Sequence, residues 1–156
     1  MSKKRNIYKS AVETFEISCF LFPVDTEDVK SDWRSHEASG IVRSVVNFNG
    51  ATEGKVVIIP SHSLLDAMAA NMLGIEDPGQ HQKEEALCEV ANIITGNIAP
   101  IFSGEDGICY IEPPKLIDEA SEVPTPKSTM AKESVSLHLD AGKADIEVYY
   151  KTEEEQ

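Results

Sequence analysis

Residues 83–98 have the sequence KEEALCEVANIITGNI. At about 100° per residue, the spacing of the apolar residues in this stretch predicts a helix. They form one stripe about 100° wide, as expected of a face that packs on a core: Leu87, Val90, Ala91, Ile94 and Ile98. The opposite side of the helix carries Glu85, Glu89, Asn92 and Gly96. We therefore expect one helix over residues 83–98, ended by Pro100, with one buried face and one exposed polar face.

The segment before this helix predicts a hairpin followed by another helix. Residues 41–48 and 55–59 are rich in β-branched residues and are separated by a glycine-containing turn, which is typical of two paired strands. Pro60 ends the second strand, and Ser61 or Ser63 can cap a helix that ends near Gly74. Asp66 follows Ser63 by three residues, which is a weak match to a capping box.

The two ends of the chain add a helix and a second hairpin. Apolar residues recur at helical spacing over residues 7–22, and Pro23 ends that segment. Residues 134–139 and 145–150 alternate apolar with polar side chains around a turn, which predicts an antiparallel hairpin with one buried face. Residues 108–111 are predicted to form a short additional strand. The predicted class is α/β of the α+β type, a mainly antiparallel sheet packed with long helices.

Composition and charge restrict the kind of protein. With 41% hydrophobic and 26% charged residues, we expect a single globular domain over residues 1–156, with a mobile loop at 118–129 and an acidic tail at 151–156. The net charge of −13 disfavours nucleic acid or an anionic membrane as a partner. No run approaches the ~20 apolar residues of a membrane span, and acidic residues interrupt the first apolar segment, so no signal peptide is expected. Three widely separated cysteines favour a reducing compartment, and we expect the cytoplasm.

The polar face of the 83–98 helix has two interpretations. On periodicity alone, an exposed glutamate and asparagine are usually only a solvated helix surface. Glu89 and Asn92 are three residues apart, however, so their side chains are neighbours on that surface. Gly96 lies one turn further along, where it has no side chain to block a partner, and a glycine there costs about 1 kcal/mol of helix stability relative to alanine.

The string from Glu89 to Ile98 resembles the signature of the CheC/CheX/FliY phosphatases of bacterial chemotaxis. In that signature a Glu, two other residues and an Asn are followed by a Gly. Residues 54–60 and 64–74 are similar to the strand and helix that lead to the active helix of the family. The family has Asp or Ser where this chain has Glu85, and its later proline is matched by Pro113 or Pro114 only with a shift of one or two residues.

The number of motifs distinguishes members of this family. CheC-like members carry two such motifs and CheX-like members carry one. In the first predicted helix Glu13 is followed three residues later by Glu16 rather than by Asn, so this helix lacks a motif. The chain is therefore most similar to CheX.

The resemblance implies a phosphatase that hydrolyses the aspartyl phosphate of a CheY-like response regulator. Asn92 would position the attacking water, and Glu89 would pair with the regulator's active-site lysine. Glu85 and Gly96 would belong to the binding surface. The chain would need no cofactor of its own, because the response regulator carries the Mg²⁺. The resemblance also implies a homodimer.

Other interpretations remain open at this point. The same fold could bind a response regulator through Glu89 without hydrolysis, or could form part of a flagellar switch. It could also form a purely structural dimer through its exposed strand edges. Cys88 lies beside Glu89, but no histidine is at helical spacing from it, so we interpret it as a half-buried structural cysteine rather than a nucleophile. The four histidines are scattered and lack the spacing of zinc ligands.

Overall fold

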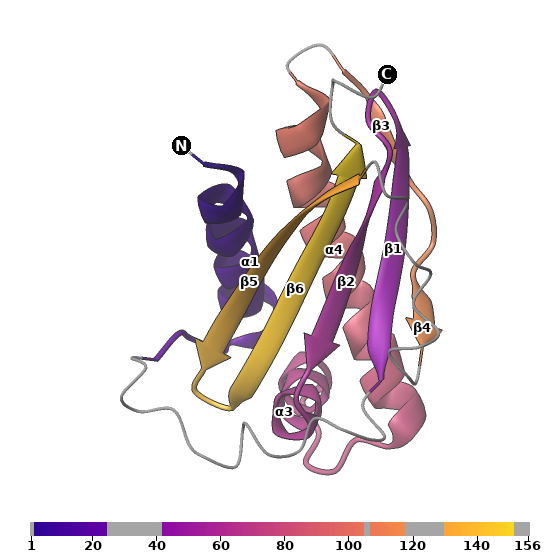
Figure 1. Cartoon of the computed structure of the whole chain (residues 1–156). Coiled ribbons are helices and arrows are strands. Elements are labelled where there is room, and N and C mark those ends of the chain that lie inside the picture. The colour runs from indigo at the N-terminus through magenta and orange to yellow at the C-terminus, as the bar shows by residue number, and fades with distance from the viewer. Residues whose placement is uncertain (1, 25–41, 105–106, 118–129, 152–156) are drawn as a thin grey trace.

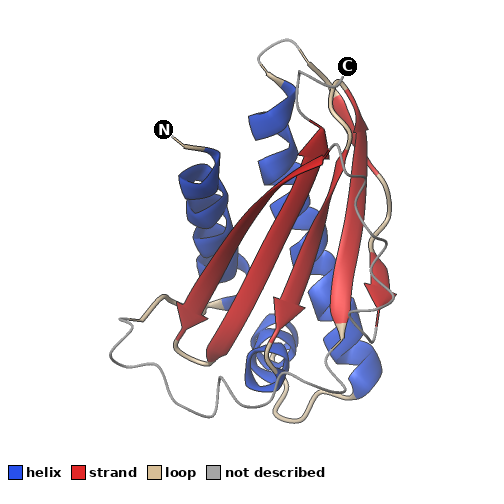
Figure 2. Cartoon of the chain, in the orientation of Figure 1, coloured by secondary structure: helices blue, strands red, loops and turns tan. Residues whose placement is uncertain are grey.

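The computed structural model describes residues 2–24, 42–104, 107–117 and 130–151. In this part of the chain one antiparallel sheet has helices on one of its faces only, so that helices and sheet form two layers (Figure 1). Figure 2 shows the same arrangement by secondary structure, with the three helices behind the strands. The α+β class predicted from the sequence is confirmed.

The sheet is six-stranded and has the order β3-β1-β2-β6-β5, with β4 also paired to β1. Each of these neighbouring strand pairs in the described residues is antiparallel. The strands are β1 (Arg43–Gly50), β2 (Gly54–Pro60), β3 (Cys109–Ile111), β4 (Lys115–Ile117), β5 (Met130–Leu139) and β6 (Gly142–Lys151). Both predicted hairpins are present, as β1–β2 and as β5–β6.

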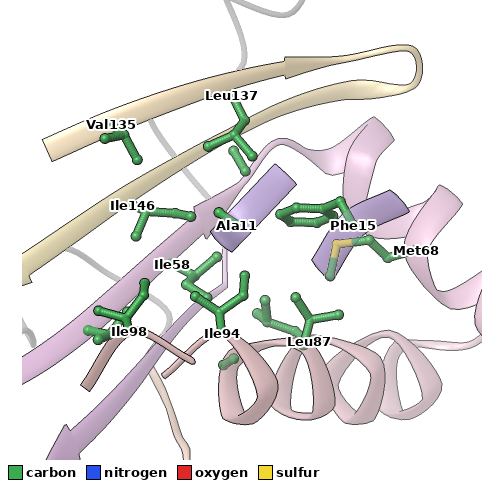
Figure 3. Close-up of a cluster of buried hydrophobic side chains, with 14 of the residues drawn as sticks. Ala11, Phe15, Ile58, Met68, Leu87, Ile94, Ile98, Val135, Leu137 and Ile146 are labelled. Carbon is green, nitrogen blue, oxygen red and sulfur yellow. The ribbon is translucent and has the colours of Figure 1, made fainter. Parts of the chain in front are cut away.

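The helices are α1 (Lys3–Cys19), α3 (His62–Leu73) and α4 (Gln80–Ser103). Their apolar sides meet the inner face of the sheet in one core, where α1, α3 and α4 surround the side chains from β2, β5 and β6 (Figure 3). All five residues of the predicted stripe on α4 are buried in this core, as the periodicity required. The alternating residues of the C-terminal hairpin are also buried: Val135, Leu137, Leu139, Ile146 and Val148.

The ends of α1 differ from the prediction. We expected a helix over 7–22, but the helix begins at Lys3 because the Ser2 side chain accepts a hydrogen bond from the Arg5 backbone N–H and caps it. It ends at Cys19 because Phe20 adopts a left-handed conformation with φ 56°. The apolar spacing therefore continued past the true end of the helix.

The ends of α4 also differ, because Pro100 lies inside the helix instead of ending it. The last turn is held by tertiary contacts that the sequence pattern does not contain. The Phe102 ring lies 4.5 Å from the Tyr150 ring and 6.2 Å from the Phe48 ring, measured between centroids. The Thr52 hydroxyl donates to the Phe102 carbonyl at 2.7 Å. These contacts offset the hydrogen bond that proline cannot make.

The caps of α3 test the helix ends predicted for that segment. Ser61, not Ser63, caps α3, since its side chain accepts from the Leu64 N–H, so the capping-box match at Ser63 was wrong. Gly74 is the C-cap, with φ 69°, as predicted. Strand β4 was not predicted. The loop at 118–129 and the tail from 152 lie outside the described residues.

By length and mean hydropathy alone, α4 is long and apolar enough to cross a membrane, which the sequence analysis did not expect. Its apolar composition has a local explanation in this fold. Eight of its residues are buried, on the side that packs against the sheet and the other helices. The remaining side faces outward and carries Glu85, Glu89, Asn92 and Gly96.

Candidate functional site

The outward side of α4 carries all four residues that the sequence analysis selected. Glu85, Glu89, Asn92 and Gly96 are exposed, whereas the residues between them that point the other way are buried. The helix is fixed at its beginning by Gln82, whose side chain accepts a hydrogen bond from the Gly79 backbone N–H at 2.8 Å. The expectation of one continuous helix over 83–98 with Glu89 and Asn92 on a common exposed face is confirmed.

Glu89 and Asn92 lie in an open groove of about 520 Å³. The floor of the groove is the outward side of α4, from His81 to Asn92, and its wall contains Pro114 and Leu116 from the β3–β4 edge of the sheet. Among the described residues that line it there is no lysine or arginine, while there are three glutamates: Glu84, Glu85 and Glu89. The groove is therefore an acidic surface with one apolar side.

The two central side chains are available for a partner. Within the described part of the chain, no hydrogen bond or ion pair engages the Glu89 carboxylate or the Asn92 amide, whereas Glu85 accepts from His81 Nε2 at 2.8 Å. His81 and Glu85 are one helical turn apart and both largely exposed. The contact orients Glu85 along the helix surface, but an exposed pair of this kind adds little stability.

Gly96 continues this surface one turn beyond Asn92. Its backbone is not in the left-handed region, so the fold does not require glycine for its conformation. A Cβ at this position would meet only the Ile111 Cδ1 atom, at 3.7 Å, which is ordinary van der Waals contact. Alanine would therefore fit, and the glycine is not explained by packing within the described residues.

Cys88 lines the groove beside Glu89 but does not have the environment of a nucleophile. Burial raises the pKa of its thiol, and the nearby Glu84 and Glu85 carboxylates raise that pKa further. A raised pKa lowers the fraction of reactive thiolate at neutral pH. The side chain is half-buried, in agreement with the structural role predicted for it.

The first helix offers no second site of the same type, because Glu13 is exposed on α1 without an amide one turn away. Within the described residues, no three side chains of His, Cys, Asp or Glu are close enough to hold a metal ion. Sequence reasoning missed four members of the groove: His81, Glu84, Pro114 and Leu116. The Pro113-Pro114 pair was noticed, but nothing in the local pattern indicates that β4 lies beside α4.

Comparison with known proteins gives a family match. A family model described as chemotaxis phosphatase CheX matches residues 42–138 of the chain. These residues include β1 to β4, α3, the whole of α4 and most of β5, and so they include the entire groove. A comparison of the sequence with curated proteins found no match.

Several solved structures share the fold of this chain. A chemotaxis protein CheX from Desulfovibrio desulfuricans has a TM-score of 0.74 and 17% sequence identity, covering 97% of this chain and 100% of that chain. CheX from Borrelia burgdorferi, in a complex with CheY, BeF3 and Mg²⁺, has a TM-score of 0.72 and 16% identity, covering 97% and 99%. FliY from Thermotoga maritima has a TM-score of 0.59 and 17% identity, covering 97% and 87%. At such identities these structures show a shared fold.

Proposed function

Since the chain belongs to the CheX family of chemotaxis phosphatases, we propose that it hydrolyses the aspartyl phosphate of a CheY-like receiver domain through Glu89 and Asn92. The observation that carries the proposal is the placement of this carboxylate and amide. They lie side by side on the exposed face of α4, in one groove, without a partner in the described chain. The complex of Borrelia CheX with CheY supports the choice of partner.

Asn92 is the residue that positions the water. Its neutral amide accepts a hydrogen bond from a water molecule and holds the water's lone pair in line with phosphorus, which is the positioning work that phosphoryl hydrolysis requires. A short amide on a rigid helix is suited to this, because the surrounding turns are fixed by the buried stripe on the other side of α4.

Glu89 docks the receiver. As an ionised carboxylate it forms a charge-assisted hydrogen bond with the receiver's active-site lysine and fixes the register of the helix on the partner. Glu84 and Glu85 add negative charge around it, which favours the approach of a basic surface. The Mg²⁺ is assigned to the receiver, in keeping with the Borrelia complex that contains CheY and Mg²⁺, and neutralises charge on the phosphoryl oxygens.

The test compares Asn92→Ala with Asn97→Ala. Both asparagines are exposed on α4, but Asn97 is five residues further and points away from the groove. In single-turnover dephosphorylation of a phosphorylated receiver, Asn92→Ala should slow hydrolysis by something on the order of 10²-fold or more, because the water is misplaced. Its dissociation constant should change by less than about tenfold, since one neutral hydrogen bond contributes about 0.5–1.5 kcal/mol. Asn97→Ala should match the wild type in both.

Glu89→Ala should weaken binding and turnover together, because the lost contact both holds and aligns the complex. Hydrolysis by Asn92→Ala at the wild-type rate would contradict the proposed role of Asn92. A wild-type protein that binds the phosphorylated receiver without releasing phosphate would instead be the non-catalytic binding or switch module of the same fold.

The remaining expectations, a cytoplasmic location and a homodimer, stay predictions. The first rests on the three free cysteines and the second on the family resemblance.

A further inference from the structure

Two short strands, β3 and β4, pair with β1 beside the groove, and their register decides which of their side chains face α4. Strand β3 places Ile111 opposite Phe48, and β4 places Leu116 opposite Ser44. Directly opposed residues of antiparallel strands point to the same face of the sheet. Phe48 packs in the core below the helices, so Ile111 and Leu116 also face the side of the sheet that carries α4.

Both side chains stand next to the functional face of α4. Leu116 lines the groove with Glu89 and Asn92, and Ile111 is the nearest neighbour of Gly96, with its Cδ1 atom 3.7 Å from the position of an added Cβ. Each is 36% exposed although each is a large apolar residue. Together they form an apolar strip that runs beside Glu89, Asn92 and Gly96. We call Ile111 and Leu116 the apolar strip.

We propose that the apolar strip is the second docking surface for the phosphorylated receiver domain, and that it sets the affinity for particular receivers without taking part in hydrolysis. This inference rests on the proposed function. The occupant follows from continuity, because Leu116 lines the same groove as Glu89 and Asn92. Ile111 lies beside Gly96, one turn further along the same exposed face of α4. A partner that brings its phosphoryl group to Asn92 must cover Leu116 as well.

The chemistry of the groove defines what the receiver must present. The described residues of the floor include three carboxylates and no lysine or arginine, so the partner contributes a basic group there. The wall is apolar, so the partner contributes an apolar side chain beside its phosphorylated aspartate. Receivers that share the lysine and the aspartate but carry a polar residue next to them would bind more weakly, because that residue would lose its water against Leu116.

The test substitutes the strip and a control on the opposite face. Leu116→Asp and Ile111→Ala are compared with Tyr110→Ala, because Tyr110 is 64% exposed on the same strand as Ile111 but is paired with Asn49 and points to the other face of the sheet. The dissociation constant is measured with a receiver that carries BeF3 and Mg²⁺ as a phosphoryl mimic. The hydrolysis rate is measured at saturating protein with the phosphorylated receiver.

Leu116→Asp should raise the dissociation constant by roughly tenfold or more, since it places an uncompensated charge against an apolar group. Ile111→Ala should raise it by about threefold to tenfold, as expected for the loss of part of one apolar contact. Neither should change the hydrolysis rate at saturation, and Tyr110→Ala should change neither quantity. Circular dichroism melting confirms that each variant is folded. Ile111→Ala is the milder change. If Leu116→Asp fails to fold, the binding and rate measurements on Ile111→Ala decide the inference.

The outcomes separate the two proposals. If the wild type binds and hydrolyses the receiver while the strip variants behave like Tyr110→Ala, the docking role of the strip is wrong and the proposed function stands. A slower rate at saturation for Ile111→Ala would also overturn the inference, because the strip would then act on the chemical step. If the wild type neither binds nor hydrolyses any receiver, the proposed function fails and the inference fails with it.

Discussion

Replacing Gly96 with alanine should make the protein more stable and less able to bind its partner. The stability gain follows from the structure, because Gly96 is inside α4 with an ordinary backbone conformation, and the added methyl meets only Ile111 at 3.7 Å. Alanine is favoured over glycine in a helix interior by about 1 kcal/mol. The loss of binding follows from the position of the methyl, one turn beyond Asn92 on the face that we propose docks the receiver. An extra methyl in a close contact costs about 1–3 kcal/mol, or roughly a fivefold to 150-fold rise in the dissociation constant.

The assay is urea denaturation together with receiver binding, and Gly74→Ala is the matched control. Gly74 is also exposed and has free space around it, but it is the C-cap of α3, and its φ of 69° is unfavourable for alanine. The same substitution should therefore destabilise the protein there and leave binding unchanged. If Gly96→Ala binds and hydrolyses like the wild type, the partner does not approach α4 closely at this turn. If Gly96→Ala is less stable than the wild type, the added methyl does not fit beside Ile111 as the 3.7 Å separation implies.

Two further predictions concern the buried side of α4 and its cysteine. Ile94→Ala should lower the free energy of unfolding by about 2–5 kcal/mol in urea denaturation, because Ile94 is fully buried in the core; a change below 1 kcal/mol would mean that this face does not anchor the helix. Alkylation of Cys88, followed by mass spectrometry, should be slower at pH 8 than that of a cysteine in a short peptide and should still increase at higher pH, because burial and the two neighbouring glutamates raise its pKa. Faster labelling than the peptide would contradict that environment.

The two faces of α4 could be predicted from the sequence because they depend only on the period of a helix. Every residue assigned to the apolar stripe is buried, and every residue assigned to the polar side is exposed. The ends of the helix depend on other parts of the chain. Pro100 ordinarily indicates a helix end, but contacts of Phe102 with Phe48 and Tyr150 extend the helix to Ser103. Those partners are far away in sequence, so no local pattern could include them.

The same distinction applies to the candidate site. Glu89 and Asn92 could be selected because they are neighbours on one helix and because the surrounding string resembles a known family. The opposite wall could not be selected, because it depends on the pairing of β4 with β1, which brings Leu116 opposite Ser44. A three-residue strand after two prolines has no alternation long enough to indicate a partner or a face. The wall of the groove, with Pro114 and Leu116, could therefore not be predicted from the sequence.

The glycine on the exposed face is better explained by a partner than by the fold. On the buried side of α4 the β-branched residues, which are poorer helix formers than alanine, contribute to packing in the core, and the Thr95 hydroxyl donates to the Ala91 carbonyl at 2.7 Å. On the exposed side Gly96 lowers helix stability although alanine would fit. A residue that lowers helix stability and is not required by packing within the chain indicates a functional role, such as contact with a partner. Under the proposed function, this contact would be the close approach of a docked receiver domain to α4 next to Asn92.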